Sequence, residues 1–300
     1  MLARSRSKKT LLMTGVILSF LIFLPSYALS QFAYTLTVSK SGSGTGTVTS
    51  DITGINCDAG NTDCTEDYFP GTVVTLTATA STGSTFTQWS GACSGSGNTC
   101  IVTMDAVKDV TARFNLPTNV SGTISANTTW TLANSPYYVT GDVIVWNGVN
   151  LTIEAGVIVK FAQFTRLAVN GTLDAVGSSG NPITFTGTSA TLGWWNRIDV
   201  RSGGSALLDN CIVQYAGYGS INGSIYKTGT GNLTITNSAI GNSGSYGIYL
   251  DNTTATGTLG SNTIQNNASH GIYLINAGNG FTINGSNTIS NNGGYGIYMV

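Results

Sequence analysis

The sequence predicts an exported, all-β protein in which a small module stapled by disulfides precedes a single-stranded solenoid of short strands. Three observations support this prediction. The first thirty residues have the composition of a secretory signal. Four of the five cysteines form two pairs of equal spacing. The later chain repeats short Val, Ile, Leu and Thr runs broken by Gly or Asn, and no long helical pattern occurs.

Residues 1–30 are typical of a cleavable signal peptide. Four basic residues precede an apolar run from Leu11 to Leu24, and the small residues Ala28 and Ser30 close the segment. The apolar run spans about fourteen residues, fewer than the roughly twenty that a membrane-spanning helix needs. We therefore expect cleavage near Ser30, with an uncleaved anchor as the alternative. A secreted protein or one on a bacterial cell surface, exported by a Sec-type route, is the expected outcome.

The charge balance excludes nucleic acid as a partner. The signal segment holds four of the twelve basic residues and none of the thirteen acidic ones, so the remaining chain has eight basic and thirteen acidic residues and a formal charge of −5. A nucleic-acid surface needs clustered Lys and Arg to neutralise phosphates. The 41% apolar content favours a folded core over a low-complexity linker.

Residues 33–115 are predicted to form the small module. Alternating runs at Tyr34–Val38 and Val73–Ala78 place apolar side chains on one face of a strand. Gly-rich segments at Ser41–Gly46 and Ser81–Ser84 separate such strands and predict turns. The alternation indicates half-buried strands around a limited core.

Two cysteine pairs are expected to staple this module. Cys57 with Cys64 and Cys93 with Cys100 each enclose six residues, and in an exported chain this spacing favours local disulfides. A zinc site is the alternative, but the module has no histidine and the spacing differs from the short CxxC knuckles that zinc prefers. Short-loop bridges contribute a few kcal/mol to a domain of this size.

The order of motifs in this module resembles the divergent InlB B-repeat family. The resemblance covers nearly all of residues 33–115 and implies a β-grasp-like spacer or adhesive domain of bacterial surface and secreted proteins. It brings no known catalytic residue to carry over. The motifs are Tyr34–Val38, Gly44–Thr47, Val73–Ala78, Phe86–Cys93, Val102–Asp105 and Val110–Phe114.

An acidic cluster surrounds the first cysteine pair and is the weak candidate for a metal site. Calcium takes several carboxylate and carbonyl oxygens, so a calcium loop remains open here. The carboxylates lack a regular D-x-D-x-D-G spacing, which favours a solvated acidic loop without a cofactor. The residues are Asp58, Asp63, Glu66 and Asp67.

Residues 118–300, beyond the helix- and strand-breaking Pro117, are predicted to form the solenoid. An Ile-x-Asn motif begins at Ile240, Ile264 and Ile289, at intervals of 24 and 25 residues, and a Gly-Ile-Tyr motif follows it with the same intervals. Short strands arranged one coil per repeat bury their apolar face only by stacking on the next coil. The interval therefore predicts stacked coils.

The repeats predict two ladders of like side chains. Ile248, Ile272 and Ile297 are expected to point inward. A second ladder at a turn is expected to use the amides of asparagines, which hydrogen-bond between coils. These asparagines are Asn242, Asn266 and Asn291.

Runs at Leu151–Phe161, Leu167–Gly177 and Asn181–Thr186 resemble the right-handed parallel β-helix proteins of the pectin-lyase-like superfamily. The similarity spans most of residues 118–300. It implies the fold and, less specifically, action on acidic polysaccharides, with calcium-binding carboxylates and a basic residue on one lateral face, or with a carboxylate pair. Because Tyr295–Val300 stops inside a strand without a polar cap, we expect the β-helix to be incomplete and further sequence to follow.

Four residues are the weak candidates for catalysis. Side chains alternate along a strand, so Arg197, Asp199 and Arg201 are expected to share one face, opposite Ile198. No family motif marks them as catalytic, and ion pairing on an exposed strand is the favoured interpretation. The fourth candidate is Asp209.

Two other residues with reactive side chains are expected to be structural. His270 occupies the position that Tyr246 and Tyr295 hold in the neighbouring repeats, which predicts a turn residue and not a general base. Cys211 is the fifth cysteine, and its strand pattern predicts a small buried residue because no basic neighbour is present to lower its pKa.

A column of tyrosines is the candidate ligand-binding surface. Each follows an inward isoleucine and is expected to point outward, where the rings offer a flat platform for sugar rings or for another protein. The favoured alternative is ring-on-ring stacking that only stabilises the ladder. Trp194 and Trp195 are a second potential sugar contact, with one of the two facing the core. The column is Tyr226, Tyr249, Tyr273 and Tyr298.

These patterns predict a non-enzymatic, exported scaffold, adhesin-like and with a polysaccharide or cell-surface glycan as the candidate ligand. The alternative is a polysaccharide lyase or glycoside hydrolase, which rests on the resemblance of the fold. Fold alone is weak support for activity. Neither hypothesis identifies the sugar or the oligomeric state.

Overall fold

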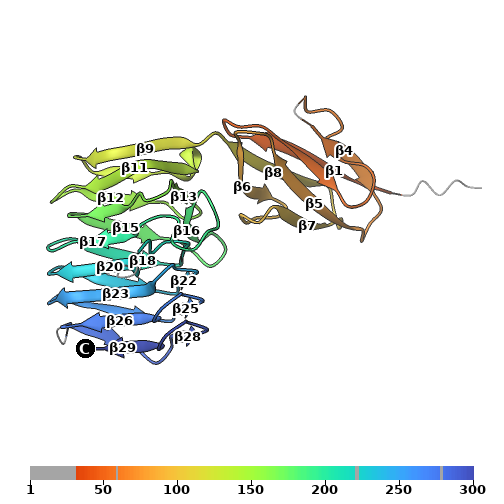
Figure 1. Cartoon of the computed structure of the whole chain (residues 1–300). Helices are drawn as coiled ribbons and strands as arrows, with labels where there is room; N and C mark the ends of the chain where they lie inside the picture. The colour runs from red at the N-terminus through yellow and green to blue at the C-terminus, as the bar shows by residue number, and fades with distance from the viewer. Residues whose placement is uncertain (1–31, 59, 220–222, 278–279) are drawn as a thin grey trace, which may run out of the picture. The chain divides into compact units, whose positions relative to one another are not determined.

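The computed structural model describes residues 32–58, 60–219, 223–277 and 280–300. The predicted signal peptide lies outside the described residues. Within them the chain is all-β apart from one 3-10 turn, η1 (Leu132–Asn134) (Figure 1). This part of the chain has no helix with the length and apolar character to span a bilayer. The predicted all-β class is confirmed.

Eight strands build the small module as two four-stranded sheets. One has the order β4-β1-β8-β6, with β1 and β8 parallel and its other pairs antiparallel, and the other has the antiparallel order β3-β2-β5-β7. The strands are β1 (Tyr34–Ser41), β2 (Gly46–Ser50), β3 (Asn56–Cys57), β4 (Thr65–Tyr68), β5 (Val73–Ala80), β6 (Thr85–Gly91), β7 (Thr99–Thr103) and β8 (Lys108–Asn115).

The module encloses its own apolar core and both predicted disulfides. Trp89 and Phe114 are buried between the sheets, with inward side chains of the alternating strands around them. The disulfides join Cys57 to Cys64 and Cys93 to Cys100, as the spacing predicted. Disulfides form and persist in oxidising compartments, so they indicate an extracellular protein.

The remaining strands coil into a parallel β-solenoid. A seven-stranded sheet, the β10–β27 row, forms one side of each coil. It contains β10 (Thr128–Trp130), β12 (Asn150–Ile153), β15 (Thr172–Val176), β18 (Ser205–Asp209), β21 (Leu233–Thr236), β24 (Gly257–Gly260) and β27 (Phe281–Ile283).

A 14-stranded sheet forms the other two sides, because β11 (Tyr137–Val145) turns a corner and pairs with β9 (Thr118–Ile124), β13 and β14. The β13–β28 row holds β13 (Ile158–Phe161), β16 (Ile183–Gly187), β19 (Cys211–Gln214), β22 (Ala239–Gly241), β25 (Thr263–Gln265) and β28 (Thr288–Ser290). The β14–β29 row holds β14 (Leu167–Val169), β17 (Ile198–Val200), β20 (Gly223–Gly229), β23 (Tyr246–Thr253), β26 (Ile272–Ile275) and β29 (Ile297–Met299).

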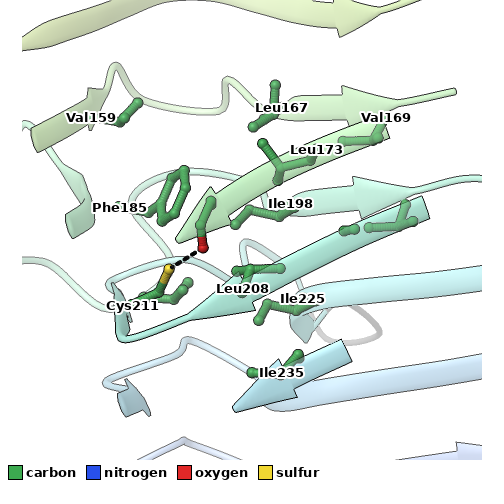
Figure 2. Packing of buried hydrophobic residues seen from close by; sticks show 14 of the residues in the cluster. Val159, Leu167, Val169, Leu173, Phe185, Ile198, Leu208, Cys211, Ile225 and Ile235 are labelled. Carbon is green, nitrogen blue, oxygen red and sulfur yellow. Dashed lines mark hydrogen bonds between the residues drawn. The ribbon is translucent and has the colours of Figure 1, made fainter. Parts of the chain in front are cut away.

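Because side chains alternate along a strand, every second side chain points into a continuous core. Leu167, Ile198 and Ile225 occupy equivalent positions of successive coils (Figure 2), and the register continues to Ile248 and Ile272. Each of these side chains is fully buried. The predicted inward ladder is confirmed at Ile248 and Ile272, whereas Ile297 continues the register but is 48% exposed.

The asparagine ladders lie one position away from the predicted residues. Asn242, Asn266 and Asn291 have φ angles of 52°, 57° and 53°, a left-handed conformation that asparagine tolerates and that reverses the direction of the chain. The residues that follow them are Ser243, Asn267 and Asn292. Ser243 and Asn267 are buried, and Nδ2 of Asn267 donates to Oδ1 of Asn292 at 2.9 Å. The turn thus shifts the amide ladder by one residue.

Candidate functional site

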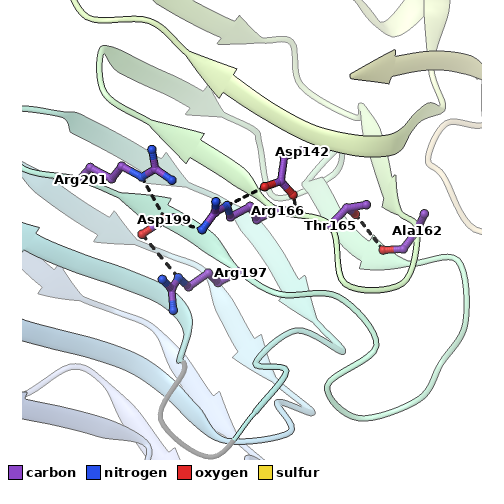
Figure 3. A network of polar contacts seen from close by, with 7 residues as sticks. All are labelled: Asp142, Ala162, Thr165, Arg166, Arg197, Asp199 and Arg201. Atoms are coloured by element: carbon purple, nitrogen blue, oxygen red, sulfur yellow. Dashed lines mark hydrogen bonds and ion pairs between the residues drawn. The ribbon is translucent and has the colours of Figure 1, made fainter. Parts of the chain in front are cut away.

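Three arginines surround one buried carboxylate on the β14–β29 row. Asp199 lies in β17 with its side chain 4% exposed. Its oxygens lie 3.1 Å from Nε of Arg201, 3.5 Å from Nε of Arg197 and 3.6 Å from Nη1 of Arg166 (Figure 3). As predicted from the alternation, Arg197, Asp199 and Arg201 share a face while Ile198 enters the core. The enclosed carboxylate offers almost no surface to a polymer.

Asp142 and Arg166 complete this group, which we call the arginine cluster: Asp142, Arg166, Arg197, Asp199 and Arg201. Nε of Arg166 donates to Oδ2 of Asp142 at 2.8 Å, and its backbone N–H donates to Oδ1 at 3.2 Å. The sequence did not identify Asp142 or Arg166, because they come from earlier coils without a clear repeat. Charge-assisted hydrogen bonds fix the guanidinium groups in place.

The arginine cluster continues directly into the tyrosine column. The Arg197 guanidinium lies 4.4 Å from the ring centroid of Tyr226, a cation–π contact. The Tyr226 hydroxyl donates to Oδ2 of Asp251 at 2.7 Å. Burial and the Asp251 carboxylate raise the pKa of Tyr226, so the phenol stays protonated as the donor. Two candidate sites that the sequence separates therefore form one continuous surface.

Seven aromatic side chains pack against each other along the late part of this row; we call them the ring stack. Tyr246 and Tyr273 lie 4.7 Å apart at 10°, and His270 and Tyr298 lie 4.7 Å apart at 14°. Near-parallel pairs such as these cover each other's ring faces, whereas Tyr249 meets Tyr226, Tyr246 and Tyr273 at 79°, 60° and 53°. Tyr295 and Tyr298 are 66% and 38% exposed. The ring stack is Tyr226, Tyr246, Tyr249, His270, Tyr273, Tyr295 and Tyr298.

His270 is part of the turn and of the ring stack. Its Nδ1 accepts the backbone N–H of Tyr295 at 2.8 Å, and its carbonyl accepts the N–H of Gly247. With Nδ1 as the acceptor, Nε2 is the ring nitrogen that can donate. The structure thus places His270 where the sequence predicted, as the counterpart of Tyr246 and Tyr295.

Asp209, the fourth catalytic candidate, is separate from the arginine cluster. It ends β18 in the β10–β27 row, where its carboxylate accepts hydrogen bonds from Thr236, Asn237 and Asn210. Burial opposes ionisation, but these hydrogen bonds outweigh it and hold the pKa of Asp209 below its ordinary value. Asp209 thereby ties the turns of neighbouring coils together.

The acidic residues of the module have separate roles. Oδ1 of Asp58 accepts the backbone N–H groups of Gly60 and Thr62 within its own loop, and these bonds, that of Thr62 first, lower its pKa. Asp67 accepts the Thr35 hydroxyl at 2.6 Å. No group of three His, Cys, Asp or Glu side chains placed to hold a metal ion occurs among the described residues. Asp63 and Glu66 join no such group.

Cys211 and Lys227 are two buried polar residues outside the groups described above. Cys211 is fully enclosed, and burial raises the pKa of its thiol to about 12, as expected for an inert residue. Lys227 is also fully buried, and its Nζ donates to the backbone carbonyls of Arg201, Gly204 and Thr228 at 3.0–3.2 Å and to that of Thr230. Because side chains alternate along a strand, the inward-pointing Ile225 implies that Lys227 two residues later also points inward.

The tryptophan pair divides as the sequence predicted. Trp195 is completely buried and stacks on Phe161 with centroids 3.9 Å apart. Trp194 is half-buried, and its Nε1 donates to Oγ1 of Thr188 at 2.9 Å. One indole thus builds the core while the other lies at the surface.

Family comparisons match the small module and the solenoid from β17 onward. Residues 34–118 match the model of the divergent InlB B-repeat domain, and residues 196–300 match that of the right handed beta helix region. The chain combines these two domains. Both resemblances drawn from the motifs are confirmed, and the stacked coils of the β14–β29 row belong to the right-handed β-helix.

Similarity to individual proteins is limited in extent. Protein bark beetle of Drosophila melanogaster is 41% identical to this chain over 59 residues. The match covers 20% of this chain and 2% of that protein, so the chain spans a very small part of the relative's length. No solved structure matches the chain.

Proposed function

We propose that this protein is an extracellular or cell-surface scaffold whose β-helix binds glycans along the β14–β29 row. The observation that carries the proposal is the continuous surface made by the arginine cluster and the ring stack, joined where Arg197 lies 4.4 Å from the Tyr226 ring. Phenol hydroxyls and guanidinium groups are hydrogen-bond donors suited to a hydroxyl-rich ligand. The two disulfides and the InlB B-repeat domain support a role outside the cell.

Retention of the purified protein on immobilised polysaccharides tests this proposal. We expect retention on at least one polymer and a weaker interaction after Tyr273→Phe, which removes an edge hydroxyl but keeps the ring in the stack. Ser290→Ala, on the β13–β28 row, is the matched control for the loss of one surface hydroxyl. Failure of every plant, bacterial and animal-type polymer to retain the protein would refute glycan binding.

The alternative function is a polysaccharide lyase or glycoside hydrolase of the same fold. Hydrolysis needs two carboxylates on either side of the scissile bond. Asp199 is enclosed by guanidinium groups and Asp209 lies on another row, so the candidates form no such pair. An assay of unsaturated uronates and reducing ends, with and without calcium, distinguishes the two functions. Calcium-dependent product that disappears in Arg201→Ala would make the protein a lyase.

A further inference from the structure

Three turns that lead into the β14–β29 row each carry one aromatic side chain at the surface. These turns follow β13, β16 and β19, and backbone hydrogen bonds hold them in layers. The Phe164 N–H donates to the Trp194 carbonyl at 3.0 Å, and the Tyr218 N–H donates to the Trp195 carbonyl at 3.2 Å. We call Phe164, Trp194 and Tyr218 the aromatic turn patch.

Two rings of this patch are exposed at the surface and contact each other. Phe164 is 49% exposed and Tyr218 is 48% exposed. Their centroids lie 4.4 Å apart with a 56° angle between the planes. Because the pair is tilted, the rings do not cover each other's faces as near-parallel rings do. Large apolar groups grouped at the surface are typical of binding sites.

The backbone at Phe164 is strained. Its φ of 65° lies in the left-handed region, which bulky side chains avoid because Cβ approaches the neighbouring backbone. The turn is fixed in this form, since both the N–H and the hydroxyl of Thr165 donate to the Ala162 carbonyl, the hydroxyl at 2.8 Å (Figure 3). The left-handed backbone and the exposed ring both destabilise the folded state. A phenylalanine at this position therefore points to a role in ligand binding.

The charge around the patch is compensated. The turns at 162–166, 188–197 and 215–219 contain two charged residues, Arg166 and Arg197. Arg166 pairs with Asp142 at 2.8 Å, and Arg197 pairs with Asp199 at 3.5 Å. Hydroxyl groups complete the surroundings, among them the exposed Ser189–Thr191 pair.

We propose that the aromatic turn patch binds an uncharged pyranose unit of a glycan. The C–H face of such a ring packs on exposed aromatic faces, while its hydroxyls bond to neighbouring polar groups. Arg166 and Arg197 are each already paired with a carboxylate, and the contacts that the patch itself offers are ring faces and hydroxyls, which suit an uncharged sugar. This inference rests on the proposed glycan binding and adds the position of the sugar contact and the class of sugar.

The test measures dissociation constants of the full exported chain for soluble polymers by affinity electrophoresis. The neutral set is hydroxyethyl cellulose, laminarin, xylan and galactomannan, and the charged set is polygalacturonate, alginate and heparin. The variants are Phe164→Asn and Tyr218→Ala, with Tyr273→Ala in the ring stack for comparison. Thermal unfolding of each variant is recorded beside binding.

We expect a neutral polymer to bind, insensitive to high salt, with its dissociation constant raised about tenfold or more in Phe164→Asn and Tyr218→Ala. Asparagine tolerates the left-handed region better than phenylalanine. The melting temperature of Phe164→Asn is therefore expected to equal or exceed that of the unchanged protein, which separates loss of binding from loss of folding.

Each of the other outcomes overturns one part of the proposal. Binding that survives both patch variants and falls only in Tyr273→Ala would overturn the patch and leave the proposed function intact. Binding restricted to charged polymers and abolished by salt would overturn the uncharged class of ligand. The absence of binding to every polymer would overturn this inference together with the proposed function.

Discussion

The early coils of the β-helix, residues 118–219, and its late coils, residues 223–300, form the same three rows in different ways. In the late coils the turn before the β14–β29 row begins with asparagine, and the side chain of Asn292 bonds to Asn267 as that of Asn267 bonds to Ser243. In the early coils the same turn varies in length and carries Phe164, Trp194 and Tyr218. The repeated late coils thus carry most of the ring stack, whereas the aromatic turn patch lies where the repetition fails.

The comparison implies different sensitivities to single substitutions. The late coils distribute stability over equivalent contacts, as expected for a quasi-one-dimensional repeat protein. The early coils concentrate it in contacts made once, such as Asp199 with its three arginines. Three measurements test this difference.

The largest effect is expected from Asp199→Ala in the early coils. The substitution leaves three partly buried guanidinium groups without their shared carboxylate, which should lower the free energy of unfolding by about 2–4 kcal/mol. Denaturant unfolding measures this value. Asp174→Ala in the neighbouring coil is the control, because that carboxylate lies on the β10–β27 row outside the arginine cluster. Equal losses in the two variants would show that the effect does not come from the arginine cluster.

A smaller effect is expected from Asn267→Ala in the late coils. The Ser243 N–H loses its acceptor, Oδ1 of Asn267 at 3.1 Å, and Asn292 loses a donor. The free energy of unfolding should fall by about 1–2 kcal/mol. Asn266→Gly in the same turn should change little, because glycine adopts the φ of 57° that Asn266 has. A loss of unfolding free energy larger than that of Asp199→Ala would contradict the expectation that the early coils are more sensitive to a single substitution.

Counted per pH unit, the smallest effect is a pH dependence at the junction between the two regions. Burial lowers the pKa of Lys227 to about 8, whereas the unfolded value is the ordinary 10.5. The unfolded chain therefore binds more protons between these values, so stability should rise with pH across this window, by at most about 1.4 kcal/mol per pH unit.

Tyrosines of the ring stack act in the opposite direction at higher pH. Burial raises the pKa of Tyr249 to about 12, so its contribution is present below the unfolded value of 10.0 and is lost as pH rises towards 12. The difference between the unchanged protein and Lys227→Met isolates the lysine. A Lys227→Met variant with the same slope between pH 8 and 10 would refute the assignment.

Sequence patterns predicted the features that depend on the repeat interval and on the alternation of side chains along a strand. The interval of 24 and 25 residues placed Ile248 and Ile272 in one ladder, and alternation placed Arg197, Asp199 and Arg201 on one face. The equal spacing of the cysteines predicted both disulfides. These features depend on local geometry that every strand or short loop shares.

The rest depends on contacts that sequence spacing does not encode. Arg166 reaches Asp199 across a coil boundary of irregular length, and Phe164 and Tyr218 meet only because their turns stack. The asparagine ladder was assigned one residue early, because the left-handed Asn266 redirects the next side chain inward. The glycan-binding role of the tyrosine column stays a prediction.

The enclosure of Cys211 matters for the maturation of the whole chain. Thiol–disulfide exchange requires an accessible thiolate, and Cys211 is buried with the pKa of its thiol raised to about 12. Once the β-helix has formed, this sulfur neither attacks the two bridges of the module nor forms mixed disulfides with oxidoreductases. Burial thereby removes a competing nucleophile from oxidative folding and leaves each remaining cysteine its local partner.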